Sequence, residues 1–209
     1  MTRIVGGRAR GRRLAVPDLG TRPTSDRARE AVFSTLESLR GTMEGSVVLD
    51  LYAGSGALGL EAFSRGASLV ELVESDRRAA RVIEANRSVV EGLSPSTGAV
   101  RVHSVTVGQW VASRGSGSEP GLDYLYDIVF CDPPYAVGAD EVKAVLLDLR
   151  RRKFLADDAS LVVERSRRDL PWAWPEGFVP VRDRLYGEAH LWIGGLAAAR
   201  ACSDSVAPC

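Results

Sequence analysis

From Val47 onward the chain alternates short apolar runs with amphipathic segments, and this alternation constrains the fold more than any other feature. Strands that alternate with helices form a parallel sheet covered by helices on both faces. The last two expected strands are joined by four residues, too few for a crossover helix, so they must be antiparallel. The sequence therefore predicts a doubly wound α/β sheet of seven strands, mostly parallel and closed by a C-terminal antiparallel hairpin. The expected strands are 47–51, 69–74, 99–103, 127–131, 159–164, 178–184 and 189–193, and the expected helices are 56–65, 77–90, 107–113 and 139–152.

The N-terminal region precedes this alternation and differs from it in composition. Residues 3–16 alternate apolar and basic residues around glycines, which predicts a β-hairpin or extended arm that lies on the main domain or on a partner. A helix is expected from 26 to 39, capped by Thr24 or Ser25, with an apolar stripe that includes Thr35 and Leu39. We therefore expect an arm at 1–22, one domain at 23–195 and a flexible tail at 196–209.

Positive charge is concentrated at the N-terminal end although the formal net charge is zero. Residues 1–30 hold eight arginines against Asp18, Asp26 and Glu30. Such a cluster can contact phosphates, whereas Arg27 and Arg29 can also lie on a solvated helix face. The candidate nucleic-acid contacts are Arg3, Arg8, Arg10, Arg12, Arg13, Arg22 and Arg27.

Composition excludes several classes of protein. No window of 18 apolar residues and no apolar signal segment occur, so we expect a cytoplasmic protein. The three cysteines form no C-x-x-C pair, which indicates neither a disulfide framework nor a metal site. Cys202 and Cys209 fall in the expected tail, and the Gly- and Ser-rich stretch 114–122 is expected to be a flexible loop.

The apolar run 128–131 ends in Asp132-Pro133-Pro134-Tyr135, an unusual end for a strand. Proline lacks an N–H and has a fixed φ, so this segment stays extended and its carbonyls are expected to face a ligand. One carboxylate and one aromatic ring stand beside these carbonyls. A planar amine such as that of a nucleobase needs two acceptors and a stacking surface, and this segment offers both. The same residues could also form only a rigid loop with a surface tyrosine.

A second motif follows the first expected strand. Gly54 to Gly59 satisfies G-x-G-x-x-G, and Glu74 ends the next strand twenty residues after Gly54, as in nicotinamide dinucleotide sites. Asp50, however, precedes the turn by four residues. A carboxylate there would repel a pyrophosphate but attract the ammonium and sulfonium of S-adenosylmethionine. Asp50 could also be a helix cap.

The order Asp50-x-x-x-Gly54-x-Gly56, Glu74 and Asp132-Pro-Pro-Tyr135 resembles class I S-adenosylmethionine-dependent methyltransferases that act on amino nitrogens. Up to about Gly194 the chain resembles the 16S ribosomal RNA guanine-N2 methyltransferase family (RsmD-like). Further matching segments are Arg3–Gly7 with Arg10–Arg12, Arg22–Arg27 and Arg184–Gly187.

The resemblance implies a fold, a cofactor and a substrate: a class I methyltransferase sheet, S-adenosylmethionine, and 16S rRNA within the small ribosomal subunit, bound by a monomer. It also implies methyl transfer to the N2 amine of a guanine. The catalytic candidates are Asp132, Pro133, Pro134 and Tyr135. The cofactor candidates are Asp50, Tyr52, Ala53, Gly54, Ser55, Gly56, Glu74, Ser75, Thr106 and Thr24.

Other interpretations remain open at this point. The Asp-Pro-Pro-Tyr site also suits N6 of adenine in DNA or in another RNA, the glycine pattern suits a dinucleotide-dependent oxidoreductase, and a non-catalytic rRNA-binding assembly factor would share the arginines. The family's acid or Asn that holds the adenine amine has no clear equivalent here, where only Ser104 or Thr106 is available. His103 and His190 are expected in the core or at its rim, and Trp172 and Trp174 over the core edge.

Overall fold

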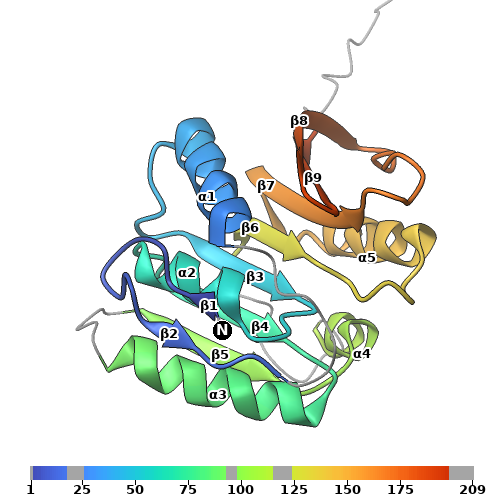
Figure 1. The fold of residues 1–209 in the computed structure, drawn as a ribbon. Coiled ribbons are helices and arrows are strands. Elements are labelled where there is room, and N and C mark those ends of the chain that lie inside the picture. The colour runs from blue at the N-terminus through green and yellow to red at the C-terminus, as the bar shows by residue number, and fades with distance from the viewer. Residues whose placement is uncertain (1, 18–25, 93–97, 115–123, 198–209) are drawn as a thin grey trace, which may run out of the picture.

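The computed structural model describes residues 2–17, 26–92, 98–114 and 124–197 of the 209-residue chain. In these ranges seven strands form one mixed sheet in the order β5-β4-β3-β6-β7-β9-β8 (Figure 1). Strands β3 to β7 pair in parallel, and β9 is antiparallel to both β7 and β8, so the predicted fold class is confirmed. The bounds are β3 (Val47–Leu51), β4 (Leu69–Val73), β5 (Ala99–His103), β6 (Tyr126–Cys131), β7 (Leu155–Ser166), β8 (Phe178–Tyr186) and β9 (Ala189–Leu196).

Five helices cover the two faces of the sheet: α1 (Asp26–Arg40), α2 (Ala57–Ser64), α3 (Arg77–Glu91), α4 (Val107–Ser113) and α5 (Ala139–Arg151). Buried side chains of α1, α2 and α3 form one hydrophobic core with one face of the sheet, and those of α4 and α5 form a second core on the other face. Trp172 is buried in the second core and Trp174 packs against it, at the core edge as predicted. None of the helices in the described ranges combines the length and apolar character needed to cross a bilayer.

Two elements differ from expectation. Strand β7 begins at Leu155 instead of 159, because an irregularity in the β6–β7 ladder after Tyr126 lets an earlier segment pair as well. In α1 the buried stripe contains Arg29 and Phe33, whereas Leu39 is 43% exposed. The predicted cap Thr24, the loop 114–122 apart from Arg114, and the tail beyond 197 lie outside the described residues.

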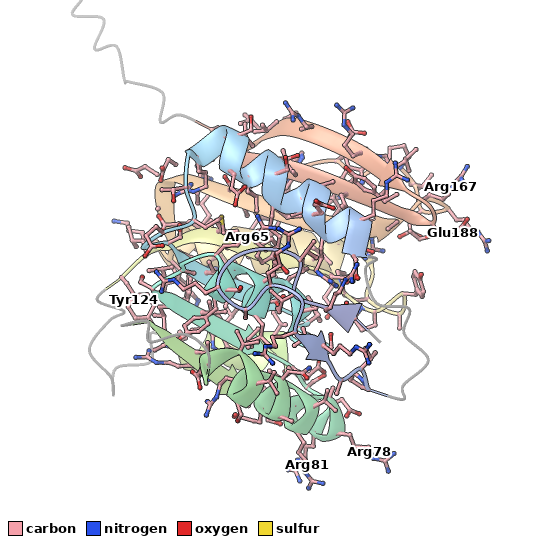
Figure 2. The ribbon with its side chains drawn as sticks, turned by 60° about the vertical axis from the view of Figure 1, so that its left-hand side comes forward. Arg65, Arg78, Arg81, Tyr124, Arg167 and Glu188 are labelled. Carbon is pink, nitrogen blue, oxygen red and sulfur yellow. The ribbon has the colours of Figure 1, made fainter. Side chains whose placement is uncertain are left out.

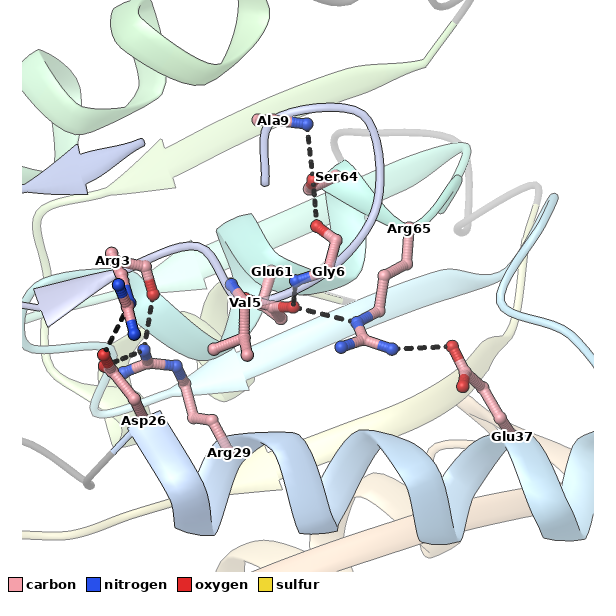
Figure 3. Close-up of polar contacts among 10 residues, drawn as sticks. All are labelled: Arg3, Val5, Gly6, Ala9, Asp26, Arg29, Glu37, Glu61, Ser64 and Arg65. Atoms are coloured by element: carbon pink, nitrogen blue, oxygen red, sulfur yellow. Dashed lines mark hydrogen bonds and ion pairs between the residues drawn. The ribbon is translucent and has the colours of Figure 1, made fainter. Parts of the chain in front are cut away.

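The N-terminal segment forms the predicted hairpin, with β1 (Thr2–Arg3) paired to β2 (Arg13–Leu14). It lies on the main domain, where the backbone N–H groups of Val5 and Gly6 each donate a 2.6 Å hydrogen bond to the buried carboxylate of Glu61 on α2 (Figure 3). A Cβ at Gly7 would lie 2.0 Å from the carbonyl oxygen of Ser64, so only glycine permits this approach. The hairpin is therefore an integral part of the fold.

Buried or half-buried arginines bind the hairpin to α1 and α2. Arg29, which is fully buried, donates a 2.6 Å hydrogen bond to the Thr2 hydroxyl. It donates a second, also of 2.6 Å, to the Arg3 carbonyl (Figure 3). Arg65 pairs with Glu61 at 2.9 Å and with Glu37 of α1 at 2.8 Å. The idea that Arg29 belongs to a solvated face is therefore wrong, because its guanidinium satisfies groups of the hairpin instead.

Candidate active site

Three carboxylates approach one another at the carboxyl-terminal edge of the sheet, where parallel strands place ligands. Asp50 is the register partner of Phe130, two residues before Asp132, and Glu74 follows β4 on the other side of β3. Burial, with smaller contributions from the negative charges of Asp132 and Glu74, raises the pKa of Asp50 to about 7, although the hydrogen bond from Gly59 acts to lower it. The edge therefore holds an excess of negative potential that suits a cationic ligand.

Asp50 also organises the start of α2. Its carboxylate accepts a 2.9 Å hydrogen bond from the backbone N–H of Gly59, in the first turn of a helix whose N-cap, Gly56, has no capping side chain. A Cβ at Gly59 would lie 2.4 Å from Leu72, so the third glycine of the pattern permits α2 to pack closely on β4. Asp50 is thus bonded to the first turn of α2, as the alternative of a helix cap predicted, and its attraction to a cationic cofactor stays a prediction.

The turn between β3 and α2 has an unusual backbone. Tyr52, Gly54 and Gly56 have φ values of 60°, 56° and 76°. A left-handed φ is uncommon for a bulky residue such as Tyr52 and marks a conformation imposed by its surroundings. The N–H of Gly56 donates to the Ala53 carbonyl at 2.7 Å, which tightens the turn, and Ser55 is buried beside it.

Glu74 is bonded to the same turn. Its carboxylate accepts the N–H of Gly54 at 2.8 Å and that of Asp76 at 2.8 Å. Each carboxylate oxygen has a second lone pair, so Glu74 can still accept hydroxyls of a ribose. Ser75 is exposed next to it.

Asn86 on α3 was not singled out from the sequence. Its side-chain amide donates 2.9 Å hydrogen bonds to the carbonyls of Ser55 and Ala15 and accepts the N–H of Ala15 at 2.8 Å. It therefore connects the glycine turn to the segment after the hairpin. The available signal was its position on the apolar stripe of α3, between Ile83 and Val90, where a polar side chain needs partners.

The Asp-Pro-Pro-Tyr segment leaves the edge at β6. Pro133 is buried, and Tyr135 has 81% of its surface exposed. The carbonyl of Pro134 accepts the N–H of Val137 at 2.9 Å, so the expectation that the proline carbonyls lack local partners is wrong at this residue. Within the described residues no such bond is found at the Pro133 carbonyl, which leaves this carbonyl as an acceptor beside the Asp132 carboxylate.

Glu164 on β7 is a second acid that sequence reasoning missed. Asp132 and Glu164 line the same hollow, together with Val32 of α1 and Leu58 of α2. Cys131 and Val163 are register partners at the end of the β6–β7 ladder. Asp132 and Glu164, the residues that follow them, therefore stand side by side at the edge of the sheet. The sequence did contain a signal for this residue, because Glu164 is the last residue of the expected strand 159–164.

The predicted nucleic-acid arginines lie on the hairpin and α1. Arg3 pairs with Asp26 at 3.2 Å and Arg8 with Glu44 at 3.2 Å. The Arg8 N–H donates to the carbonyl of Ser64, so the hairpin tip lies at the opposite end of α2 from the glycine turn. The remaining described members of the set, Arg10, Arg12, Arg13 and Arg27, are exposed, and Arg22 lies outside the described residues.

The residues after β5 include Ser104 and Thr106, the residues available for the predicted contact with the adenine amine. Thr106 forms a capping box with Gln109 at the start of α4, which occupies its hydroxyl, and Ser104 is exposed. His103 lies 3.6 Å from Glu71, which is fully buried on β4. Burial alone would raise the pKa of Glu71, but hydrogen bonds from His103, Tyr126 and Tyr124 and the charge of Arg114 lower it to about 2. This buried network stabilises the sheet below the candidate site.

The family model described as "Conserved hypothetical protein 95" matches residues 2–195. Among curated proteins, ribosomal RNA small subunit methyltransferase D of Escherichia coli K12 is 38% identical over 188 residues, covering 89% of this chain and 85% of that protein. The Haemophilus influenzae protein of the same name is 31% identical over 186 residues, covering 88% of this chain and 89% of that protein.

Solved structures agree with these relatives. A structure from Escherichia coli named as a candidate methyltransferase, YhhF, has 30% identity and a TM-score of 0.76, and covers 95% of this chain and 99% of that chain. A hypothetical protein from Thermus thermophilus has 30% identity and a TM-score of 0.72, covering 92% of this chain and 98% of that chain. The chain therefore belongs to the family of the small-subunit ribosomal RNA methyltransferase D proteins.

Proposed function

We propose that this chain transfers a methyl group from S-adenosylmethionine to the N2 amine of a guanine in 16S rRNA of the small ribosomal subunit. Its relatives are small-subunit rRNA methyltransferases, and the chain is accordingly an S-adenosylmethionine-dependent methyltransferase that acts on 16S rRNA. This removes the dinucleotide-dependent oxidoreductase that the glycine pattern had left open. The choice of guanine N2 is the further step argued below.

The charges at the sheet edge fit the cofactor. S-adenosylmethionine is a cation at its sulfonium and at its ammonium and supplies an activated methyl group. Asp50 is buried with a raised pKa, so a nearby positive charge favours its ionised form. We assign cofactor contacts to Asp50, Glu74, Ser75, Thr24 and the turn Tyr52–Gly56, with Glu74 holding the ribose. Because the Thr106 hydroxyl caps α4, we assign the contact of Thr106 to its backbone.

Asp132 and the Pro133 carbonyl hold the amine. They accept its two hydrogens, which directs the nitrogen lone pair toward the methyl carbon. The N2 lone pair forms the new bond as the bond from carbon to sulfur breaks, and the amine then loses a proton to solvent or to Asp132. Alignment of this kind is worth roughly 7–11 kcal/mol. No strong base is required, because the amine becomes acidic only once methylated.

The observation that carries the choice of guanine is the pair of acids in one hollow. Guanine presents N1–H and the N2 amine side by side on its Watson–Crick edge, whereas adenine presents a lone pair at N1. Glu164 beside Asp132 accepts the guanine N1–H, and the same carboxylate would repel the N1 lone pair of adenine. Tyr135, which is exposed at the corner, stacks on the extruded base.

The test is to identify the product. Purified small subunits, deproteinised rRNA and DNA are incubated with labelled S-adenosylmethionine, and the nucleosides are separated by mass spectrometry. We expect N2-methylguanine from RNA, and N6-methyladenine as the product would overturn the assignment. Asp132→Ala and Glu164→Gln should each lower kcat/KM while leaving S-adenosylhomocysteine affinity unchanged. Full methylation by Asp132→Ala would instead support a site that does not use the Asp-Pro-Pro-Tyr corner.

A further inference from the structure

A second hollow adjoins the first and is lined by residues of α1 and of the C-terminal hairpin formed by β8 and β9. Val32 of α1 and Leu191 of β9 line both hollows. The second hollow adds four residues of β8: Arg182, Asp183, Arg184 and Tyr186. We call the two adjoining hollows together the α1–hairpin groove. Asp132 and Glu164 line its first hollow, and residues of β8 line its second.

The strand register explains why arginines line this groove. Residues of one strand alternate between the two faces of a sheet, so Arg182, Arg184 and Tyr186 share a face. Arg184 is the register partner of Leu191, and Leu191 is the register partner of Glu164. Arg184 thus stands two strands from Glu164, about 10 Å at the usual strand spacing. That distance is within reach of nucleotides adjacent to a base held at Asp132.

These arginines are available for binding. Arg182 and Arg184 are exposed, and neither pairs with an acid in the described part of the chain. Asp183, between them, also lines the second hollow, but its carboxylate already pairs with His190 at 2.8 Å. By contrast, the hairpin residues Arg3 and Arg8 already pair with Asp26 and Glu44. Guanidinium groups bind phosphate oxygens through two parallel hydrogen bonds, so an unpaired pair beside the site suits a polyanionic strand.

We propose that the α1–hairpin groove binds the single-stranded RNA on one side of the target base, with Arg182 and Arg184 contacting its phosphates. Tyr186, half-buried against the core, forms the apolar wall against which a neighbouring ribose or base packs. The inference rests on the proposed function, since it requires RNA as the substrate. It places phosphate contacts on the C-terminal hairpin in addition to those predicted for the exposed arginines of the N-terminal one.

The test measures RNA affinity against salt. Arg182→Ala, Arg184→Ala and the double variant are titrated with rRNA, and log K is plotted against log salt concentration. Each lost phosphate contact lowers the slope by roughly 0.7 on single strands, so the double variant should lose about 1.4. In methylation assays KM should rise with kcat retained. S-adenosylhomocysteine affinity and the melting temperature should not change, since both side chains are exposed.

Arg81→Ala is the matched control, because Arg81 is an exposed arginine on α3. It lies at the bottom of Figure 2, whereas Glu188 of the β8–β9 turn lies at its right-hand side. The control variant should leave the slope and KM unchanged. The proposal that the groove binds RNA would be overturned if the double variant kept the wild-type slope and KM while Arg12→Ala and Arg13→Ala lowered the slope instead. The product assay separates the two proposals: N2-methylguanine with an unchanged slope refutes only the groove, whereas another product refutes the guanine assignment and leaves the slope measurement valid.

Discussion

The N–H of Gly59 donates a 2.9 Å hydrogen bond to the buried carboxylate of Asp50, so one acid serves both the helix that follows the glycine turn and the ligand edge. We expect this dual position to make cofactor binding dependent on pH. Burial raises the pKa of Asp50 to about 7, so in the ligand-free protein the carboxylate ionises only near neutrality. A cationic ligand favours the ionised form.

We therefore expect S-adenosylhomocysteine, which keeps the ammonium, to bind more tightly as the pH rises from 6 to about 8. Calorimetry across this range measures the dissociation constant directly. Asp50→Asn keeps an oxygen acceptor for the Gly59 N–H but cannot ionise, so its affinity should be weaker and independent of pH. The same pH slope in both proteins would assign the dependence to another group.

Tyr135 is expected to contribute to substrate binding without contributing to stability. Its ring is 81% exposed, and base stacking on an aromatic side chain is worth about 1–3 kcal/mol. Tyr135→Ala should lower kcat/KM roughly 5- to 150-fold, with an unchanged melting temperature. Tyr135→Phe keeps the ring and should retain most activity. A phenylalanine variant as impaired as the alanine variant would show that the hydroxyl, not stacking, matters.

The buried Glu71 network should govern stability at acid pH. The hydrogen bonds and the charge around Glu71 outweigh its burial and lower its pKa from 4.5 to about 2. A lowered pKa stabilises the folded state above pH 4.5, and this contribution, on the order of 3 kcal/mol, is lost as the pH falls toward 2. Glu71→Gln should remove that part of the pH dependence, measured by thermal unfolding between pH 2 and 6. Asp140→Asn, at a side chain 98% exposed, is the control and should not alter the profile.

Gly7 and Gly11 form a matched pair for testing how the N-terminal hairpin docks. Both have positive φ values, 72° and 83°, but a Cβ at Gly7 would meet the Ser64 carbonyl at 2.0 Å, whereas a Cβ at Gly11 meets nothing within 4 Å. Gly11→Ala should cost only the left-handed backbone penalty, roughly 1–2 kcal/mol. Gly7→Ala should cost more and expose the hairpin to proteolysis. Equal unfolding free energies in the two variants would mean that the hairpin can move to accommodate the Cβ at residue 7 without loss of stability.

Asn86 is expected to support cofactor affinity through the turn that it binds. Asn86→Ala leaves the carbonyls of Ser55 and Ala15 and the N–H of Ala15 without this partner, at about 1–3 kcal/mol for each buried group left unsatisfied. Both stability and S-adenosylhomocysteine affinity should fall. Gly7→Ala disturbs the hairpin at its tip, so it should lower stability with a smaller effect on affinity. Equal affinity losses would assign the effect to the hairpin as a whole.

The sequence predicted the sheet well because its strands are short apolar runs whose order follows directly from parallel pairing. It also placed Asp50, Glu74 and Asp132 at one edge, since each ends a parallel strand. Arg29 was misjudged because its partners, Thr2 and the Arg3 carbonyl, come from a segment that local periodicity does not include. The Pro134 carbonyl was misjudged because its partner, Val137, depends on a turn after the motif.

The residues missed in the site share one property. Asn86 lies on the apolar stripe of a helix, and Glu164 lies at the end of an expected strand. The local sequence pattern accounts for both positions without a role in the site. Their relevance arises only when the fold brings Ser55 to one and Asp132 to the other. Composition and spacing describe neighbours along the chain, whereas these contacts join elements that are distant in sequence.

The attachment of Val5 and Gly6 to Glu61 has a consequence for the order of folding. The two ends of these bonds lie 56 and 55 residues apart in the chain. During synthesis the hairpin emerges first, yet the carboxylate that receives its N–H groups does not exist until α2 has been made. The hairpin, which is translated before α2, must therefore remain undocked until this helix has been made, and it closes onto the domain afterwards.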